Sequence, residues 1–303
     1  MNVKPILAVL TFIAVAYGLA WLIALPLWLE GGLKNPLFLS ISIAFMFTPA
    51  VAAVIVGKLF EPQVRLVAAL RTAPAKGRFG AIILYSLLGI VLALFMTLGG
   101  LLVGQAFGVL QLDLLHFSAL RELIISKLNG QPLPASMPPL WVLVLVQLVV
   151  VVVASPINAL AAIGEEIGWR GWLLPRLQPI GLKPAIIVSG VIWGLWHAPL
   201  VLLGYNYPGL PAWQALGCMS AMCTAVGIFL AWLRWRSDSV LPCAIAHGAI
   251  NAGAGFYMIL GTAGQTVDVT QATMLGWTGW LLPAAIGVGL FVLFPIRERE
   301  TEF

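Results

Sequence analysis

The segment from Leu140 to Arg170 reads LWVLVLVQLVVVVVASPINALAAIGEEIGWR, and residues 140–163 within it contain no charged side chain. About 20 consecutive apolar residues are enough to cross the hydrocarbon core of a bilayer as a helix. We therefore predict a membrane-spanning helix over 140–163, followed at once by two adjacent carboxylates, Glu165 and Glu166. The rest of the chain repeats the apolar part of this pattern several times.

The composition excludes a water-soluble globular protein. Hydrophobic residues make up 61% of the 303 residues and charged residues 9%, whereas about a quarter of a soluble protein is charged. The 16 Lys and Arg and the 11 Asp and Glu leave a net charge of +5, but they lie between long uncharged stretches. Such a distribution offers no basic face, so no nucleic-acid partner is expected. Three cysteines without CxxC spacing predict neither a disulfide framework nor a thiolate metal site.

We predict an all-α, polytopic integral membrane protein with about eight transmembrane helices, because uncharged stretches of spanning length follow one another along the chain. The stretch 184–233 must hold two of them, since Gly204 to Gly209 is rich in turn-forming residues and contains Pro208. The predicted spans are 5–29, 37–59, 80–104, 140–163, 184–204, 212–233, 240–260 and 275–295.

Basic residues divide unevenly between the two sides that these spans define. Cytoplasmic loops carry an excess of Lys and Arg. With the N-terminus inside, 13 basic residues fall on the inner side and only Lys34, Arg121 and Lys127 on the outer side. We therefore expect the plasma (inner) membrane as the location, with both termini cytoplasmic. Short interfacial helices are expected within 60–78 inside and 106–138 outside, where apolar and basic residues alternate.

Few ionisable residues lie at membrane depth, where each is costly and therefore a candidate functional residue. They are the acid pair Glu165 and Glu166, His197 in the fifth predicted span and His247 in the seventh. The third histidine, His116, lies in a predicted loop. A carboxylate and two imidazoles could thus meet between three helices.

Helical spacing assigns partners within these groups. Glu166 and Arg170 are i,i+4 neighbours that can pair, whereas Glu165 is rotated by about 100° and left free. His247 and Asn251 are also i,i+4 neighbours and can point at one target. Each feature also has a purely structural interpretation: an ion pair at a helix end, a packed histidine or an interhelical hydrogen bond. Their coincidence in one third of the chain favours a functional site.

Signatures of soluble enzymes are absent. The chain contains no HExxH helix, no GxSxG elbow and no Walker-type glycine loop. A serine mechanism, a zincin fold and a nucleotide-binding loop are therefore not expected.

Three motifs in order, Glu165-Glu166-x-x-x-Arg170, Trp193-x-x-x-His197 and His247-x-x-x-Asn251, resemble the signature of the CPBP family. This family, also called ABI, comprises CAAX prenyl proteases and bacteriocin-processing enzymes, and the motifs are similar to those of the Ras-converting type of CAAX prenyl endopeptidase. The second motif usually begins with Phe, and Trp193 here changes the shape of the pocket. The resemblance implies an eight-helix intramembrane protease with its core in spans four to seven.

By this resemblance the chain is one membrane domain, 1–303, in three parts. Residues 1–139 hold the first three spans and their loops, 140–260 the catalytic core, and 261–303 the last span and a cytoplasmic tail. The catalytic residues would be Glu165 as general base, His197 holding the same water, and His247 with Asn251 stabilising the oxyanion. Glu166 and Arg170 would order the fourth helix. The partners implied are membrane lipid and a peptide or protein substrate, which could carry a prenylated C-terminal CAAX sequence.

No cofactor is expected under this mechanism, but three alternatives stay open. Glu165, His197 and His247 could bind zinc, since two His and one Glu plus water form a recurrent catalytic set. Acid and His residues within a bundle also mark proton-coupled transporters, although no inverted halves are visible in the sequence. Finally, the chain could be a non-catalytic membrane partner that has kept the fold.

Overall fold

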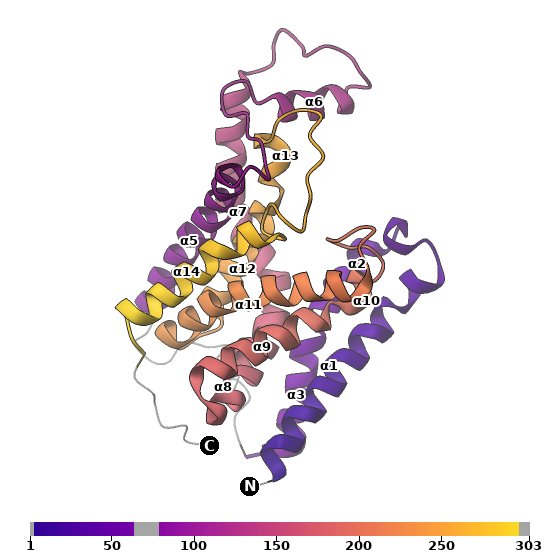
Figure 1. Ribbon diagram of the computed structural model, residues 1–303. Coiled ribbons are helices and arrows are strands. Elements are labelled where there is room, and N and C mark those ends of the chain that lie inside the picture. The colour runs from indigo at the N-terminus through magenta and orange to yellow at the C-terminus, as the bar shows by residue number, and fades with distance from the viewer. Residues whose placement is uncertain (1–2, 64–78, 297–303) are drawn as a thin grey trace.

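The computed structural model describes residues 3–63 and 79–296, and within these ranges all regular elements are helices (Figure 1). One isolated bridge joins Leu112 and Gly261, and the described residues form no strand. Six helical stretches are long and apolar enough to cross a membrane: Pro5–Leu29, Phe38–Phe60, Phe79–Ala106, Leu140–Ile180, Ala212–Ser237 and Leu241–Leu260. The predicted all-α, polytopic membrane fold is confirmed. The count of eight spans is not, because the predicted fifth and eighth spans are shorter helices.

The described helices are joined by turns of a few residues and by longer loops over 107–117, 128–139, 202–211 and 261–276. In chain order they are α1 (Val3–Leu29), η1 (Gly32–Lys34), α2 (Phe38–Met46), α3 (Thr48–Phe60), α5 (Phe79–Ala106), α6 (Ser118–Lys127), α7 (Leu140–Glu166), η2 (Ile167–Leu173), α8 (Leu174–Leu177), η3 (Gln178–Ile180), α9 (Leu182–Trp196), α10 (Ala198–Val201), α11 (Ala212–Ser237), α12 (Leu241–Gly253), η4 (Ala254–Phe256), α13 (Tyr257–Leu260) and α14 (Trp277–Leu293). The segment η2 is a π-helix and the other η segments are 3₁₀-helices.

Two predicted spans are interrupted at prolines. The second divides into α2 and α3 at Phe47, just before Pro49, and the fifth ends as α9 at Trp196, just before Pro199. Proline has no backbone N–H to continue the helical ladder, and both prolines occupy the first turn of the next helix. As a result α9 is only about 22 Å long, against about 30 Å for the hydrocarbon core. His197 lies at this interruption.

The fourth predicted span extends further than expected. Helix α7 does not end at residue 163 but continues through Glu165 and Glu166 and passes directly into the π-helix η2. The two carboxylates therefore lie inside a continuous helical segment, Leu140–Ile180, rather than beyond its end. Short π segments inside α-helices occur often at functional sites.

The candidate site is built where α7, α9, α11 and α12 pack together (Figure 1). Small residues allow these helices to approach one another closely. A Cβ on Gly248 of α12 would lie 2.6 Å from the carbonyl oxygen of Ser155 on α7. A Cβ on Gly194 of α9 would lie 2.7 Å from the backbone nitrogen of Ser220 on α11. At both contacts only glycine lets the two backbones meet this closely.

A group of short helices and loops, hereafter the cap, covers one end of the bundle. It consists of α6, the loop 107–117 before it, α13 and the loop 261–276 (Figure 1). Helix α6, Ser118–Lys127, confirms the helix expected within 106–138. The inner counterpart expected within 60–78 falls mostly on residues 64–78, which lie outside the described residues. Which side of the membrane each terminus occupies stays a prediction.

Candidate active site

Two adjacent carboxylates are buried at the junction of α7 and η2. Glu165 exposes 2% of its surface and Glu166 none. Arg170 Nη1 donates to Glu166 Oε1 at 2.9 Å, so the predicted i,i+4 ion pair is confirmed. Both partners of the pair are buried, and for that reason it is held in one geometry by the protein around it, unlike a surface pair.

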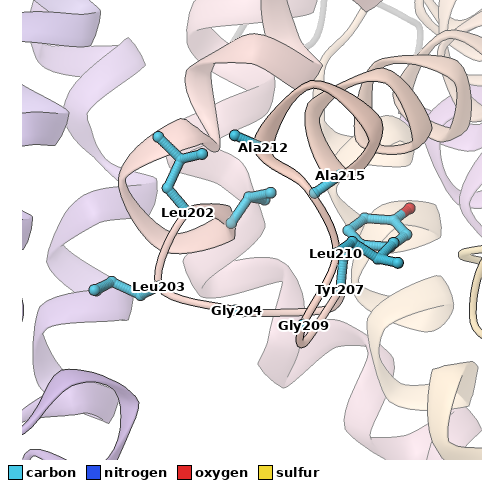
Figure 2. A pocket seen from close by; sticks show the side chains of 9 residues that line it. Leu202, Leu203, Gly204, Tyr207, Gly209, Leu210, Ala212 and Ala215 are labelled. Carbon is cyan, nitrogen blue, oxygen red and sulfur yellow. The ribbon is translucent and has the colours of Figure 1, made fainter.

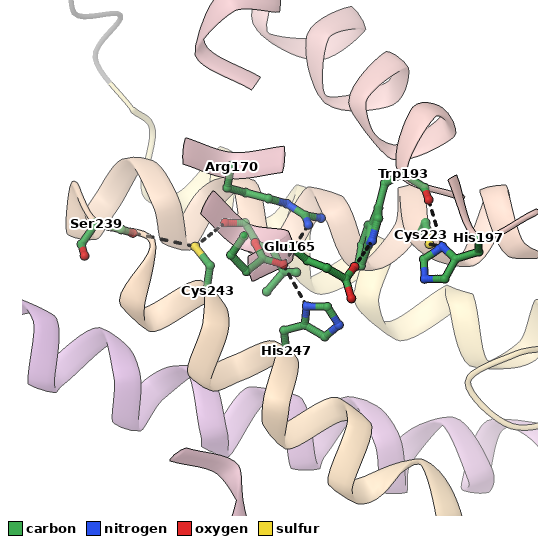
Figure 3. Close-up of polar contacts among 10 residues, drawn as sticks. Glu165, Arg170, Trp193, His197, Cys223, Ser239, Cys243 and His247 are labelled. Atoms are coloured by element: carbon green, nitrogen blue, oxygen red, sulfur yellow. Dashed lines mark hydrogen bonds and ion pairs between the residues drawn. The ribbon is translucent and has the colours of Figure 1, made fainter. Parts of the chain in front are cut away.

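Glu166 also binds His247, a contact that the sequence did not predict. His247 Nδ1, from α12, lies 2.9 Å from the same oxygen, Glu166 Oε1 (Figure 3). An ionised carboxylate only accepts hydrogen bonds, so Nδ1 carries the hydrogen and Nε2 is left for another partner. The second oxygen, Glu166 Oε2, is buried without a hydrogen bond among the described residues. Glu166 thus links α12 to its own helical segment.

Glu165 is held by one donor from α9. The indole Nε1 of Trp193 donates to Glu165 Oε2 at 2.6 Å. Within the described residues the other oxygen, Oε1, makes no hydrogen bond, and no Lys or Arg forms an ion pair with this carboxylate. Of the two acids, Glu165 is therefore the one with an oxygen free to accept a proton and without a neutralising cation bound to it.

His197 lies one helical turn beyond Trp193 and is half-buried. Its Nδ1 is 2.9 Å from the carbonyl oxygen of Trp193, and the same nitrogen is 4.0 Å from Cys223 Sγ on α11. Because a carbonyl oxygen can only accept, Nδ1 carries the hydrogen and Nε2 is the nitrogen left to bind a substrate or water. In Figure 3 the Trp193 side chain stands between His197 and the Glu165 carboxylate.

The indole of Trp193 occupies the middle of this cluster. Its ring lies 5.3 Å from the His247 ring and 6.1 Å from the His197 ring, centroid to centroid. The guanidinium carbon of Arg170 lies 4.1 Å above its centroid, a cation–π geometry. Hereafter "the buried cluster" means Glu165, Glu166, Arg170, Trp193 and His247, with His197 adjoining it.

Asn251 is the predicted site residue that the structure does not join to the cluster. It is exposed, although His247 one turn before it is buried, and its carboxamide makes no hydrogen bond with any described residue. Its assignment to the oxyanion stays a prediction.

The zinc alternative does not fit the side chains as they stand. In residues 3–63 and 79–296 no group of three or more His, Cys, Asp or Glu side chains lies close enough to hold a metal ion. Nδ1 of each histidine is engaged, by Glu166 or by a backbone carbonyl, which leaves Nε2 free, but these nitrogens and the Glu165 carboxylate do not lie close enough together to share one ion. Binding zinc through Glu165, His197 and His247 would require these side chains to move. Whether the protein uses a cofactor stays a prediction.

A cavity of about 300 Å³ lies apart from the cluster, under the loop that joins α10 to α11 (Figure 2). Its wall includes Leu203, Leu210 and Tyr207, whose hydroxyl donates to the carbonyl oxygen of Leu275 at 2.9 Å. It shares no lining residue with the buried cluster. None of its lining side chains is an acid, a histidine or a cysteine that could activate water.

Two contributions to the site were missed by sequence reasoning. The Trp193 indole was expected to change the shape of the pocket and not to donate a hydrogen bond, and the contact of Cys223, a buried core residue, with His197 was not predicted. No signal in the sequence indicated either contact, and its spacing indicated only a third one, between His197 and the backbone of Trp193. The four-residue spacing of Trp193 and His197 allows the histidine to bond to the carbonyl of the preceding turn.

Two comparisons with known proteins bear on the identity of this site. Residues 138–253 match the family model described as Type II CAAX prenyl endopeptidase Rce1-like. CAAX prenyl protease 2 of Methanococcus maripaludis is 29% identical over 138 residues, which is 44% of this chain and 47% of that protein. The match thus spans about half the length of the curated relative. The resemblance inferred from the three motifs is confirmed over these residues, which include the buried cluster, His197 and Asn251.

Proposed function

We propose that this protein is an intramembrane endopeptidase of the CAAX prenyl protease type, in which Glu165 activates the water that cleaves the peptide bond. One observation carries the proposal. Glu165 is a buried carboxylate inside a membrane-embedded helix, has one oxygen free, and accepts its one hydrogen bond among the described residues from Trp193 on α9. A buried acid with so few partners is costly to fold, and such residues gather at functional sites. The matched segment 138–253 supports the same conclusion.

In the proposed reaction, Glu165 Oε1 accepts a proton from water as the water oxygen attacks the carbonyl carbon of the substrate. His197, through Nε2, orients the same water. The C–N bond then breaks, and the proton held by Glu165 passes to the leaving amine. The products are one carboxylate and one amine, so the reaction needs no redox partner.

The negative charge that develops on the carbonyl oxygen needs donors. His247 can supply one through Nε2 when both ring nitrogens carry hydrogens, because Nδ1 is already occupied by Glu166. Asn251 would supply the second from the exposed side of α12. Such donors count most where water is excluded, as within this bundle.

The substrate is proposed from the relatives' names together with the location of the site in a membrane-embedded helix bundle. Both names refer to a CAAX prenyl protease or endopeptidase. A prenylated peptide would partition into the bilayer around the exposed apolar surfaces of the helices. We therefore propose a peptide or protein substrate with a prenylated C-terminal CAAX sequence, reached from the lipid.

The test is cleavage of fluorogenic peptides, prenylated and unprenylated, by detergent-purified protein. Wild type is compared with Glu165→Gln and with Glu30→Gln, a matched variant at an exposed carboxylate. Each is assayed with and without a strong chelator. Loss of the general base should lower kcat by about 10²- to 10⁴-fold, whereas Glu30→Gln should cleave like wild type.

The chelator separates the mechanisms. Activity unaffected by chelation but lost in Glu165→Gln supports the proposal. Activity lost on chelation and restored by zinc would replace it with the zinc alternative. If wild type cleaves no peptide, the protease proposal fails for these substrates, and proton-coupled flux in proteoliposomes then tests the transporter alternative.

A further inference from the structure

Trp193 makes two hydrogen bonds that end on the two groups assigned to the attacking water. Its indole N–H donates to Glu165 Oε2 at 2.6 Å, and its backbone carbonyl accepts from His197 Nδ1 at 2.9 Å. One residue thus contacts the proposed base on α7 and the proposed water ligand at the end of α9. Phe, Leu or any other residue without a side-chain donor would make only the second of these contacts.

The first hydrogen bond fixes how Glu165 presents its free oxygen. A glutamate side chain has three rotatable bonds, and this one has no other hydrogen-bond partner among the described residues. With Oε2 held by the indole, Oε1 is left in one defined position. The site exposes only 2% of Glu165 and 3% of Trp193, and a hydrogen bond is stronger in such surroundings than in water.

The indole is in turn held from both sides. Arg170 stacks on its face at 4.1 Å and is tied to Glu166 at 2.9 Å, while the His247 ring meets it at 5.3 Å with an interplanar angle of 72°. The ring therefore has little freedom to turn away from Glu165. The Glu166–Arg170 pair, predicted only to order α7, also fixes the position of the donor.

We infer that Trp193 is a positioning residue that sets the orientation of the Glu165 carboxylate, and through the adjoining turn that of His197, for attack by water. This inference rests on the proposed function for its catalytic consequence. The hydrogen bond itself can be tested independently of any activity.

The catalytic test compares Trp193→Phe, which keeps an aromatic ring but removes the N–H, with Trp280→Phe. Trp280 also donates its indole N–H, at 3.1 Å to the carbonyl oxygen of Leu275, so the control loses an equivalent bond elsewhere. Trp193→Phe should lower kcat about tenfold or more with KM unchanged, because the Glu165 carboxylate loses its fixed orientation for the chemical step while the contacts that bind substrate are not altered. Trp280→Phe should change neither constant. Unchanged kcat in Trp193→Phe, or a change confined to KM, would overturn the inference.

The spectroscopic test uses protein labelled with ¹⁵N at the tryptophan indoles. The Trp193 signal is identified by its loss in Trp193→Phe. In Glu165→Leu, which removes the acceptor, that signal should move to lower proton frequency while the Trp280 signal stays in place. A Trp193 signal indifferent to Glu165→Leu would refute the contact. If wild type cleaves no peptide, the proposed function fails, and this measurement still decides whether Trp193 holds Glu165.

Discussion

The carboxylates of the buried cluster and those of the cap differ in burial and in how completely their oxygens are hydrogen-bonded. In the cap, Asp113 accepts from the backbone N–H groups of His116 and Ser118, and Asp268 accepts three bonds from Thr270 and Gln271. Both acids stabilise loops at the water-exposed end of the bundle. In the cluster, Glu165 Oε1 and Glu166 Oε2 have no partner within the described residues, although both acids are buried.

The difference separates structural acids from candidate catalytic ones. An exposed acid whose oxygens are hydrogen-bonded lowers the stability of the fold little. Its hydrogen bonds within the loop are enough to explain its presence there. A buried acid with an unpaired oxygen lowers the stability of the fold, because its loss of hydration is not fully replaced. Retention of two such acids side by side fits a chemical role for the cluster better than a structural one.

The largest effect should come from breaking the buried ion pair. Arg170→Met leaves Glu166 buried with only His247 beside it and should lower the free energy of unfolding by about 3–5 kcal/mol. In the cap, Asp268→Asn should lower it by less than about 1 kcal/mol, since that residue is exposed. Denaturant unfolding in detergent, followed by tryptophan fluorescence, measures both.

A double variant sharpens this contrast. Glu166→Leu combined with Arg170→Met replaces both charges with apolar groups and should recover part of the loss, because no unpaired charge remains. If Arg170→Met and Asp268→Asn lowered the free energy of unfolding equally, burial would not distinguish the buried cluster from the cap.

Close helix packing beside the cluster should give an intermediate effect. In Gly194→Ala the new methyl group would lie 2.7 Å from the backbone nitrogen of Ser220, so α9 and α11 must separate, at about 1–3 kcal/mol. Gly217→Ala on α11 is the matched control, because its new methyl group would have no atom within 4 Å, and alanine favours the helix. Thermal unfolding of both variants tests the prediction, and equal stabilities would contradict it.

The smallest effect concerns the cap and depends on pH. Hydrogen bonds from Ser118 and from the His116 backbone lower the pKa of Asp113 from 3.8 to about 2. A lowered pKa in the folded state stabilises the cap fully above pH 4, and this contribution disappears as the pH falls toward 2. Hydrogen exchange at the His116 and Ser118 amides should therefore accelerate relative to the intrinsic rate over that interval. Asp113→Asn should remove this pH dependence, and its persistence would assign it to another group.

Sequence periodicity and helical spacing determined most of the fold and one contact of the site. Uncharged stretches of spanning length predicted the helices, because a bilayer leaves no alternative for a long apolar segment. The i,i+4 spacing predicted the Glu166–Arg170 pair, because helix geometry alone brings these two side chains together.

Contacts between helices were decided only by the tertiary structure. Glu166 and His247 are 81 residues apart, and Glu165 and Trp193 are 28 apart, so neither pair follows from local spacing. Which of two adjacent acids meets which partner depends on the rotation of α7 against α9 and α12, and a rotation of one residue, about 100°, would exchange them. The sequence by itself identified the acids, histidines and tryptophan of the site as candidates. Packing between helices decided that Trp193 holds Glu165 while Glu166 binds His247, because relative rotation is set by the whole interface and not by any one segment.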